Sequence, residues 1–152
     1  MNNYPIEDIL PHKEPMILID SLIEYETNTA CCQVNITTQS PFYETKQQGV
    51  PSYIGCEYMA QSIAAFAGAH ALDNNDTVSI GFLLGSRKYK TFVPYFPLGK
   101  TLQITIKELY AEDSGLRVYE CEITDTDTNL LAQANINVFQ PNDPETFIEQ
   151  SA

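Results

Sequence analysis

Two polar residues, Glu57 and Gln61, stand one helical turn apart in a segment that is otherwise small and apolar. The carboxyl group of Glu57 can act as a general acid if apolar surroundings raise its pKa, although a helix N-terminus favours the anion and lowers the pKa. The alternative is that Glu57 only stabilises the first helical turn. Gln61 can bind a substrate carbonyl or hydroxyl group, or it can be a buried amide that hydrogen-bonds to neighbouring main chain.

The other residues that could do chemistry are two histidines and four cysteines. His70 lies about 20 Å along the helical segment from Glu57, at 1.5 Å per residue, so the two cannot meet within one subunit, and a core or subunit-contact role is expected for His70. The cysteines lack metal-binding spacing and the histidines are far apart, so no metal site is expected. Cys56 has no evident partner base, which argues against covalent catalysis, and all four cysteines are expected as reduced core thiols.

A long apolar helix must position Glu57 and Gln61. The segment 57–72 is nearly all small or apolar and has no broad polar face, which is typical of a buried helix. At about 24 Å it would be too short to span a bilayer comfortably, so its cover must be protein.

Strands are predicted on both sides of this helix. A short helical turn at 5–10 precedes a hairpin of two strands, 16–25 and 29–38, and an ordered loop at 40–56 leads into the helix. Four further strands are predicted, at 78–90, 101–111, 116–124 and 130–139. Several alternate apolar and polar residues, with turn residues between them, so they indicate an antiparallel meander with one dry face. The order predicts an α+β fold in which a curved antiparallel sheet wraps around a central helix.

Composition excludes several classes of protein. A chain of 152 residues with 43% hydrophobic and 18% charged residues predicts a single domain at 1–140 and an acidic, loose tail at 141–152. A formal charge of −12 argues strongly against nucleic-acid binding. No long apolar run or secretory signal is present, so no membrane span and a cytoplasmic location are expected.

Several stretches resemble one protein family. Residues 10–20, LPHKEPMILID, look like the opening of the 3-hydroxyacyl-acyl-carrier-protein dehydratases, and residues 57–61, EYMAQ, resemble the start of their central helix. Residues 81–87 and the ending 134–139 are most similar to the branch associated with aryl-polyene-type lipid synthesis. The resemblance covers about residues 5–140 and implies a hot-dog fold, an antiparallel sheet wrapped around a long central α-helix.

One departure from the family concerns its catalytic base. The fatty-acid members carry a catalytic histidine in a Gly-His-Phe-Pro motif, whereas the equivalent stretch here, 44–49, has no histidine, and the usual Pro-Gly pair is Pro51-Ser52. In similar proteins the Leu-Pro-His segment lies near the acyl tunnel, which makes His12 the best replacement base; a hydrogen-bonded strut is an equal alternative. Glu57 occupies the position of the family's catalytic carboxylate.

The resemblance implies a hydro-lyase that removes water from a 3-hydroxyacyl chain on an acyl carrier protein and uses no cofactor. The reaction needs a base for the C2 proton, an acid for the leaving hydroxyl and donors for the thioester oxygen. His12 and Glu57 are predicted as base and acid, brought together across a dimer interface. Main-chain N–H groups at Gly55 and Cys56, together with the Gln61 side chain, are the predicted substrate-binding groups.

A dimer is predicted because a helix that is apolar on all sides needs more cover than one sheet provides, and because pairing hides a sheet edge. The partner can be an identical chain or a second hot-dog subunit. Four basic residues are predicted to dock the acidic carrier protein, the alternative being a solvated strand face: Arg87, Lys88, Lys90 and Lys100.

Two other functions stay open from the sequence. A hot-dog thioesterase would use a carboxylate near the helix start to direct water at the thioester carbonyl. An inactive subunit, lacking the motif histidine, would instead support an active dehydratase by completing a shared dimer.

Overall fold

The computed structural model describes residues 2–78 and 82–139. Its elements, in chain order, are α1 (Ile6–Ile9), β1 (Ser21–Tyr25), β2 (Thr29–Asn35), β3 (Gly49–Pro51), the 3₁₀ turn η1 (Ser52–Ile54), α2 (Gly55–Asp73), β4 (Phe82–Thr91), β5 (Tyr95–Pro97), β6 (Thr101–Ala111), β7 (Leu116–Thr124) and β8 (Leu130–Phe139). The expected tail at 141–152 and part of the expected strand at 78–90 lie outside the described residues.

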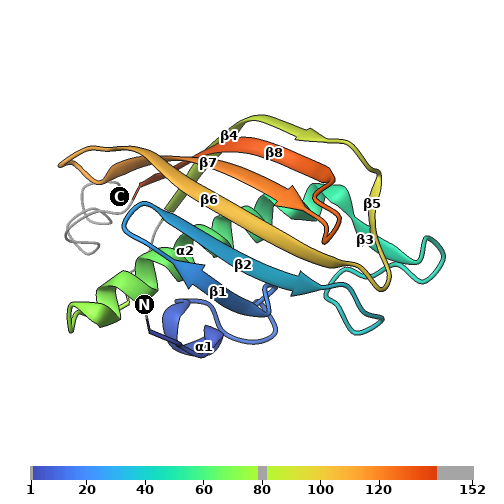
Figure 1. Ribbon diagram of the computed structural model, residues 1–152, viewed down its shortest axis with the longest axis horizontal. Coiled ribbons are helices and arrows are strands. Elements are labelled where there is room, and N and C mark those ends of the chain that lie inside the picture. The colour runs from blue at the N-terminus through green and yellow to red at the C-terminus, as the bar shows by residue number, and fades with distance from the viewer. Residues whose placement is uncertain (1, 79–81, 140–152) are drawn as a thin grey trace, which may run out of the picture.

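Six strands form one antiparallel sheet in the order β1-β2-β6-β7-β8-β4, and α2 lies along one face of it (Figure 1). The hairpin β1-β2 and the meander β6-β7-β8 are as predicted. The expectation was wrong for β4, which does not join the meander beside β6 but pairs with β8 at the far edge of the sheet. The short pair β3-β5 was not predicted.

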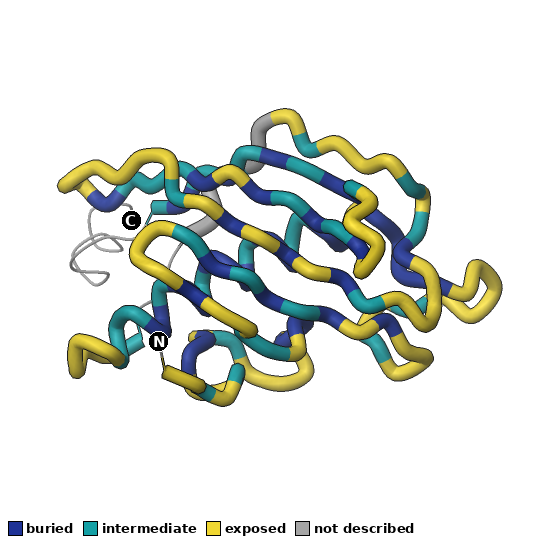
Figure 2. Tube along the Cα trace, viewed as in Figure 1, coloured by how far each residue is buried: buried dark blue, intermediate teal, exposed yellow. Residues whose placement is uncertain are grey.

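Four strands of the sheet, β2, β6, β7 and β8, alternate between buried residues and residues that are half-buried or exposed (Figure 2). In β6, the residues Leu102 and Ile104 are fully buried, whereas Gln103 and Thr105 between them are exposed. The buried face packs against α2, which contributes residues such as Met59 and Phe66 to the core. The predicted pattern of one dry and one wet face is therefore confirmed.

The helix α2 begins two residues earlier than predicted because the η1 turn continues directly into it. The amide of Gly55 donates to the Ser52 carbonyl, closing the turn at the point where the helix starts. One side of the helix is a half-buried stripe of small residues at Ala60, Ala64 and Ala67. Within the part of the chain that the structure describes, no helix is both long and apolar enough to cross a membrane.

The segment before β1 packs along α2 and does not pair as a strand. A strand was expected from residue 16, but β1 starts only at Ser21. The main chain of Met16 and Leu18 hydrogen-bonds to the side chain of Gln61 on α2. These main-chain groups therefore find their partners on the helix, where a strand would need a neighbouring strand.

Candidate active site

Gln61 joins the predicted acid to the segment that carries the predicted base. Its side chain is buried, with 1% exposed. The Nε2 group donates to the Met16 carbonyl at 2.8 Å and to Oε1 of Glu57 at 3.4 Å, and Oε1 of Gln61 accepts from the Leu18 amide at 2.8 Å. These are the bonds of a buried amide that ties main chain to the helix, and the substrate-binding role of Gln61 stays a prediction.

Glu57 stands in the first turn of α2 and is the acidic residue of that turn. Its side chain is half-buried, at the start of the stripe of small residues. Because the side chain is only half-buried, a group from outside the chain can approach it.

His12 lies in the segment between α1 and β1, which is fixed to α2 on both sides of the histidine. Before it, the main chain of Ile9 contacts Gly68, and after it, Met16 bonds to Gln61. The Nδ1 atom of His12 is buried and has no hydrogen-bond partner among the described residues. No hydrogen bond of the His12 side chain is found among the described residues, and both the base and the strut interpretations stay predictions.

The structure does not bring the predicted base and acid into contact within one chain. No hydrogen bond or ion pair between His12 and Glu57 is found in the ranges 2–78 and 82–139. Their meeting across a dimer interface stays a prediction.

Gly55, the first residue of α2, is buried against the core, whereas the sequence predicted that its main-chain N–H group binds substrate. A Cβ on Gly55 would lie 3.0 Å from both Ile123 and Phe96 and would overlap the hydroxyl of Tyr89. The amide of Gly55 is already used by the η1 turn, whereas Cys56 is half-buried. Substrate binding by Gly55 and Cys56 remains a prediction.

Tyr89 is a residue of this region that the sequence analysis missed. It lies on β4, and its hydroxyl donates to the Ser52 carbonyl at 2.5 Å. Burial raises the pKa of the hydroxyl, and the main-chain amide of Cys56 partly opposes this effect. The available signal was the alternation of an aromatic residue with two lysines, Lys88 and Lys90, which is typical of a strand with one inward residue.

His70 packs at the opposite end of α2, as expected. Its Nε2 lies 2.7 Å from the Glu26 carbonyl oxygen, which accepts a hydrogen bond from this nitrogen. Its ring makes edge-on contacts with Tyr25 and Phe66, with ring centroids 5.2 and 4.7 Å apart. These contacts assign His70 to the packing of the helix end.

The four cysteines are free thiols, as predicted. Cys31 is half-buried and its neighbour Cys32 is fully buried, because they point to opposite faces of β2. Burial raises the pKa of Cys32 to about 12 and also raises that of Cys121. Among the described residues, no three His, Cys, Asp or Glu side chains are grouped so that they could hold a metal ion.

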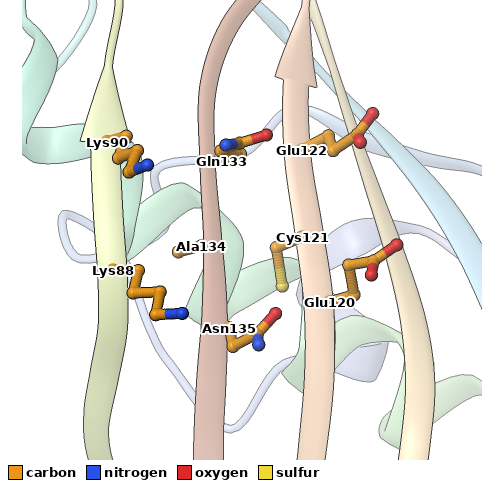
Figure 3. A pocket seen from close by; sticks show the side chains of 8 residues that line it. All are labelled: Lys88, Lys90, Glu120, Cys121, Glu122, Gln133, Ala134 and Asn135. Carbon is orange, nitrogen blue, oxygen red and sulfur yellow. The ribbon is translucent and has the colours of Figure 1, made fainter.

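Two of the predicted docking residues come together on the outer face of the sheet. Lys88 and Lys90 line a depression of about 260 Å³, which Glu120 and Glu122 line from β7 (Figure 3). Lys100 is exposed but lies just before β6, where its positive charge helps to lower the pKa of Asp125. The side chain of Arg87 lies outside the described part. The structure therefore groups the two central lysines and does not place Lys100 in their depression.

A six-stranded antiparallel sheet with a long helix against one face is the hot-dog fold, and solved structures confirm it. The dehydratase heterocomplex ApeI:P from Xenorhabdus doucetiae contains a chain that is 30% identical, with a TM-score of 0.89, covering 99% of this chain and 100% of that one. The PaaI protein from the phenylacetic acid degradation operon of E. coli has a TM-score of 0.60 at 15% identity, covers 78% of this chain and 80% of its own, and supports the fold alone.

The sequence comparisons identify the family. The 3-hydroxyacyl-[acyl-carrier-protein] dehydratase FabZ of Syntrophotalea carbinolica is 31% identical over 141 residues, which are 90% of this chain and 92% of that protein. FabZ of Chlamydia trachomatis is 32% identical over 97 residues, 60% of this chain, and the match spans 63% of the chlamydial protein's length. The model of the ApeP-like family, described as ApeP dehydratase, matches residues 4–149. The chain belongs to the ApeP-like dehydratase family, as the resemblance predicted.

Proposed function

We propose that this protein dehydrates 3-hydroxyacyl chains, carried on an acyl carrier protein, to trans-2-enoyl thioesters in fatty-acid or aryl-polyene-type lipid synthesis. The observation that carries the proposal is the half-buried Glu57 in the first turn of α2, bonded to the buried Gln61, in a chain of a dehydratase family. FabZ relatives with this activity support the reaction class.

The proposed reaction uses His12 as base and Glu57 as acid. His12 takes the proton from C2, the electrons of that C–H bond form the C2–C3 double bond, and the C3–O bond breaks. Glu57 gives its proton to the departing hydroxyl, which leaves as water. The amide group of Cys56 is proposed to stabilise the charge on the thioester oxygen, with Gln61 nearby, and no cofactor is required. The Gly55 amide can contribute only by sharing the hydrogen bond that it donates to the Ser52 carbonyl.

A second hot-dog subunit is the proposed partner. The stripe of small residues on α2 is half-exposed in the single chain, and the described residues do not join His12 to Glu57 within one chain. A partner lying on this stripe would cover the helix and complete the site. The similar chain in the ApeI:P complex is part of a heterocomplex, which supports a non-identical subunit as one partner. A site that pairs His12 with Glu57 across an interface requires in addition a second copy of this chain.

The acyl carrier protein is proposed to dock at the basic residues of β4. Lys88 and Lys90 supply adjacent positive charges on the outer face, whereas Glu120 and Glu122 across the depression would repel an acidic partner. The carrier protein would therefore contact the β4 edge, with Arg87 and, further along the chain, Lys100. A cytoplasmic location stays a prediction.

A supporting subunit without chemistry of its own is the second candidate, favoured by the absence of a histidine from residues 44–49. The test assays the purified chain alone and mixed with a second hot-dog dehydratase subunit, on carrier-bound 3-hydroxyacyl and plain acyl substrates separately. Dehydration that depends on His12 and Glu57 of this chain supports the proposal. Dehydration by the mixture alone that tolerates loss of both residues supports the second candidate. Hydrolysis of the plain acyl thioester would indicate a thioesterase and contradict both.

A further inference from the structure

Tyr89 lies on β4, and its side chain reaches the start of α2. Its neighbours Lys88 and Lys90 point instead to the outer face of the sheet (Figure 3). The Tyr89 hydroxyl donates to the Ser52 carbonyl at 2.5 Å and lies against Gly55, where a Cβ would overlap it. One hydroxyl group therefore joins an edge strand of the sheet to the first turn of the central helix.

A β-bulge gives Tyr89 this direction. The pairing of β4 with β8 shifts between Arg87 and Lys90, and Lys88 takes the left-handed conformation with a φ of 56°. Regular pairing would place Lys88 opposite the buried Ala134 and would turn Tyr89 to the outer face, because a one-residue change of register exchanges the faces. The bulge thus keeps both lysines in solvent and directs the tyrosine to the helix.

The start of α2 has no side-chain cap from its own sequence. Its N-cap residue is Ile54, which makes no capping hydrogen bond. The Ser52 carbonyl, which closes the η1 turn with the Gly55 amide, also accepts the bond from Tyr89. Burial raises the pKa of Tyr89, so the hydroxyl keeps its proton and remains a donor. This contact holds the junction of η1 and α2 two residues before Glu57.

We propose that Tyr89 is a positioning residue for Glu57, an inference that rests on the dehydratase function proposed above. By fixing the Ser52 carbonyl to β4, the Tyr89 hydroxyl sets the place of the first turn of α2 relative to the sheet. The carboxyl of Glu57 then lies where it can protonate the leaving hydroxyl. A displacement of about 1 Å at a catalytic group can lower the rate by ~10²-fold, so this anchoring has a measurable effect.

The kinetic test is Tyr89→Phe, which keeps the ring and removes the hydroxyl. We expect kcat to fall about 10-fold with KM changed less than about twofold, because positioning acts on the chemical step. Tyr95→Phe is the matched control and should leave kcat unchanged, since among the described residues its hydroxyl bonds to the exposed Glu44 at 3.3 Å. If Tyr89 acts through Glu57, adding Tyr89→Phe to Glu57→Gln should cause no further loss.

Two results would overturn the inference. The first is a kcat of Tyr89→Phe within twofold of the wild type, and the second is a kcat of the double variant with Glu57→Gln that falls by the product of the two single losses. Gly55→Ala is a second variant, because its Cβ would push the hydroxyl away. The same Cβ would also lie 3.0 Å from Ile123 and Phe96, so the variant should lower kcat in both backgrounds, but by less in the Tyr89→Phe background. An equal added loss in both backgrounds would contradict the anchoring.

Amide hydrogen exchange does not depend on enzyme activity, so it tests this inference separately from the proposed function. Amide hydrogen exchange at residues 56–59 should become about 10-fold faster in Tyr89→Phe, whereas exchange near Phe66 should not change. A wild-type protein that dehydrates nothing, alone or with a partner, would remove the proposed function, and the exchange measurement would still test the anchoring. Unchanged exchange at 56–59 would overturn the anchoring whatever the activity.

Discussion

The main chain of Ile9 lies directly against Gly68 of the central helix. A Cβ on Gly68 would overlap the Ile9 carbonyl oxygen and lie 2.8 Å from its carbonyl carbon. The glycine therefore lets α1 approach α2 more closely than any other residue would allow. This contact anchors the chain three residues before His12, so the packing of two helices also sets the place of the predicted base.

Gly68→Ala should destabilise the protein. Alanine is favoured over glycine inside a helix by about 1 kcal/mol. The overlap with rigid main chain of α1 should cost more than this gain, so we expect a net loss of about 1–2 kcal/mol in the free energy of unfolding. Urea denaturation measures the change in the free energy of unfolding. Ala71→Ser is the control, because it also adds one heavy atom to α2. A variant as stable as the wild type would show that α1 is free to move away.

Gln61→Met should also destabilise the fold, although methionine matches glutamine in size. The Leu18 amide would lose a buried hydrogen bond of 2.8 Å, and the Met16 carbonyl would lose a part-buried one of the same length. An unsatisfied buried group costs about 1–3 kcal/mol, so the expected loss in the free energy of unfolding is about 2–4 kcal/mol. Gln103→Met, at an exposed position of β6, should change it by less than about 0.5 kcal/mol. Equal losses in the two variants would contradict this role of Gln61.

The helix, the hairpin and the meander could be predicted from the sequence because each depends on local periodicity. The apolar run from Glu57 is long enough to leave no alternative to a buried helix, and β6 and β7 alternate without interruption. The pair β3-β5 was missed because Gly49, Pro51 and Pro97 are typical of loops, and proline is tolerated in strands only at edges or ends.

Long-range contacts explain the parts of the site that could not be predicted. The position of β4 beside β8 depends on a chain crossing that alternation does not encode. The alternation of Tyr89 with two lysines was visible in the sequence, but the β-bulge that directs Tyr89 inward was not, because lysine gives no sign of the left-handed conformation that Lys88 takes. The Glu57–Gln61 spacing was visible in the sequence, but the bonds of Gln61 to Met16 and Leu18 join segments more than 40 residues apart.

Asp73, at the end of α2, should make stability depend on pH in the acid range. Hydrogen bonds from Tyr4, Tyr25 and Asn2 lower the pKa of its carboxyl from 3.8 to about 2. Because the folded-state pKa is depressed, the carboxylate contributes stability above the unfolded value near 4, and this contribution is lost as the pH falls toward 2. Thermal unfolding of Asp73→Asn should therefore show a lower Tm than the wild type at pH 7 and a similar Tm near pH 2.

The control for this prediction is Asp76→Asn, an exposed position in the turn after α2. It should shift Tm little at either pH, because surface changes away from specific contacts have small effects. A Tm difference between Asp73→Asn and the wild type that stays constant from pH 7 to pH 2 would mean that the bonds to Tyr4 and Tyr25 do not depend on the charge.

Reversing the charges on β4 should separate carrier-protein docking from chemistry. Arg87→Glu with Lys88→Glu should raise KM for the carrier-bound substrate by about 10-fold or more and leave KM for a short pantetheine thioester nearly unchanged. Lys107→Glu, an exposed position of β6 in the same sheet, is the matched control and should affect neither substrate strongly. Equal increases of KM for both substrates would contradict docking at β4.

Replacing His12 or Glu57 tests the proposed chemistry directly. His12→Ala and Glu57→Gln should each lower kcat by about 10²-fold or more with little change in KM, as expected for loss of a general base or acid. Glu7→Gln, at an exposed carboxyl of α1, should leave kcat unchanged. Circular dichroism and light scattering must show that each variant folds and assembles like the wild type.

Because the described residues join His12 to Glu57 by no bond within one chain, the two variants also test whether the site is shared between subunits. If the base and the acid act in one site built from two copies, mixing His12→Ala with Glu57→Gln chains should restore about a quarter of the wild-type activity per chain. Half of the dimers in the mixture contain one chain of each variant. In each of these mixed dimers, one of the two sites contains both His12 and Glu57. No recovery, with exchange of subunits demonstrated, would mean that the two residues act within one chain or toward a different partner. Wild-type dehydration by His12→Ala would show that another group is the base.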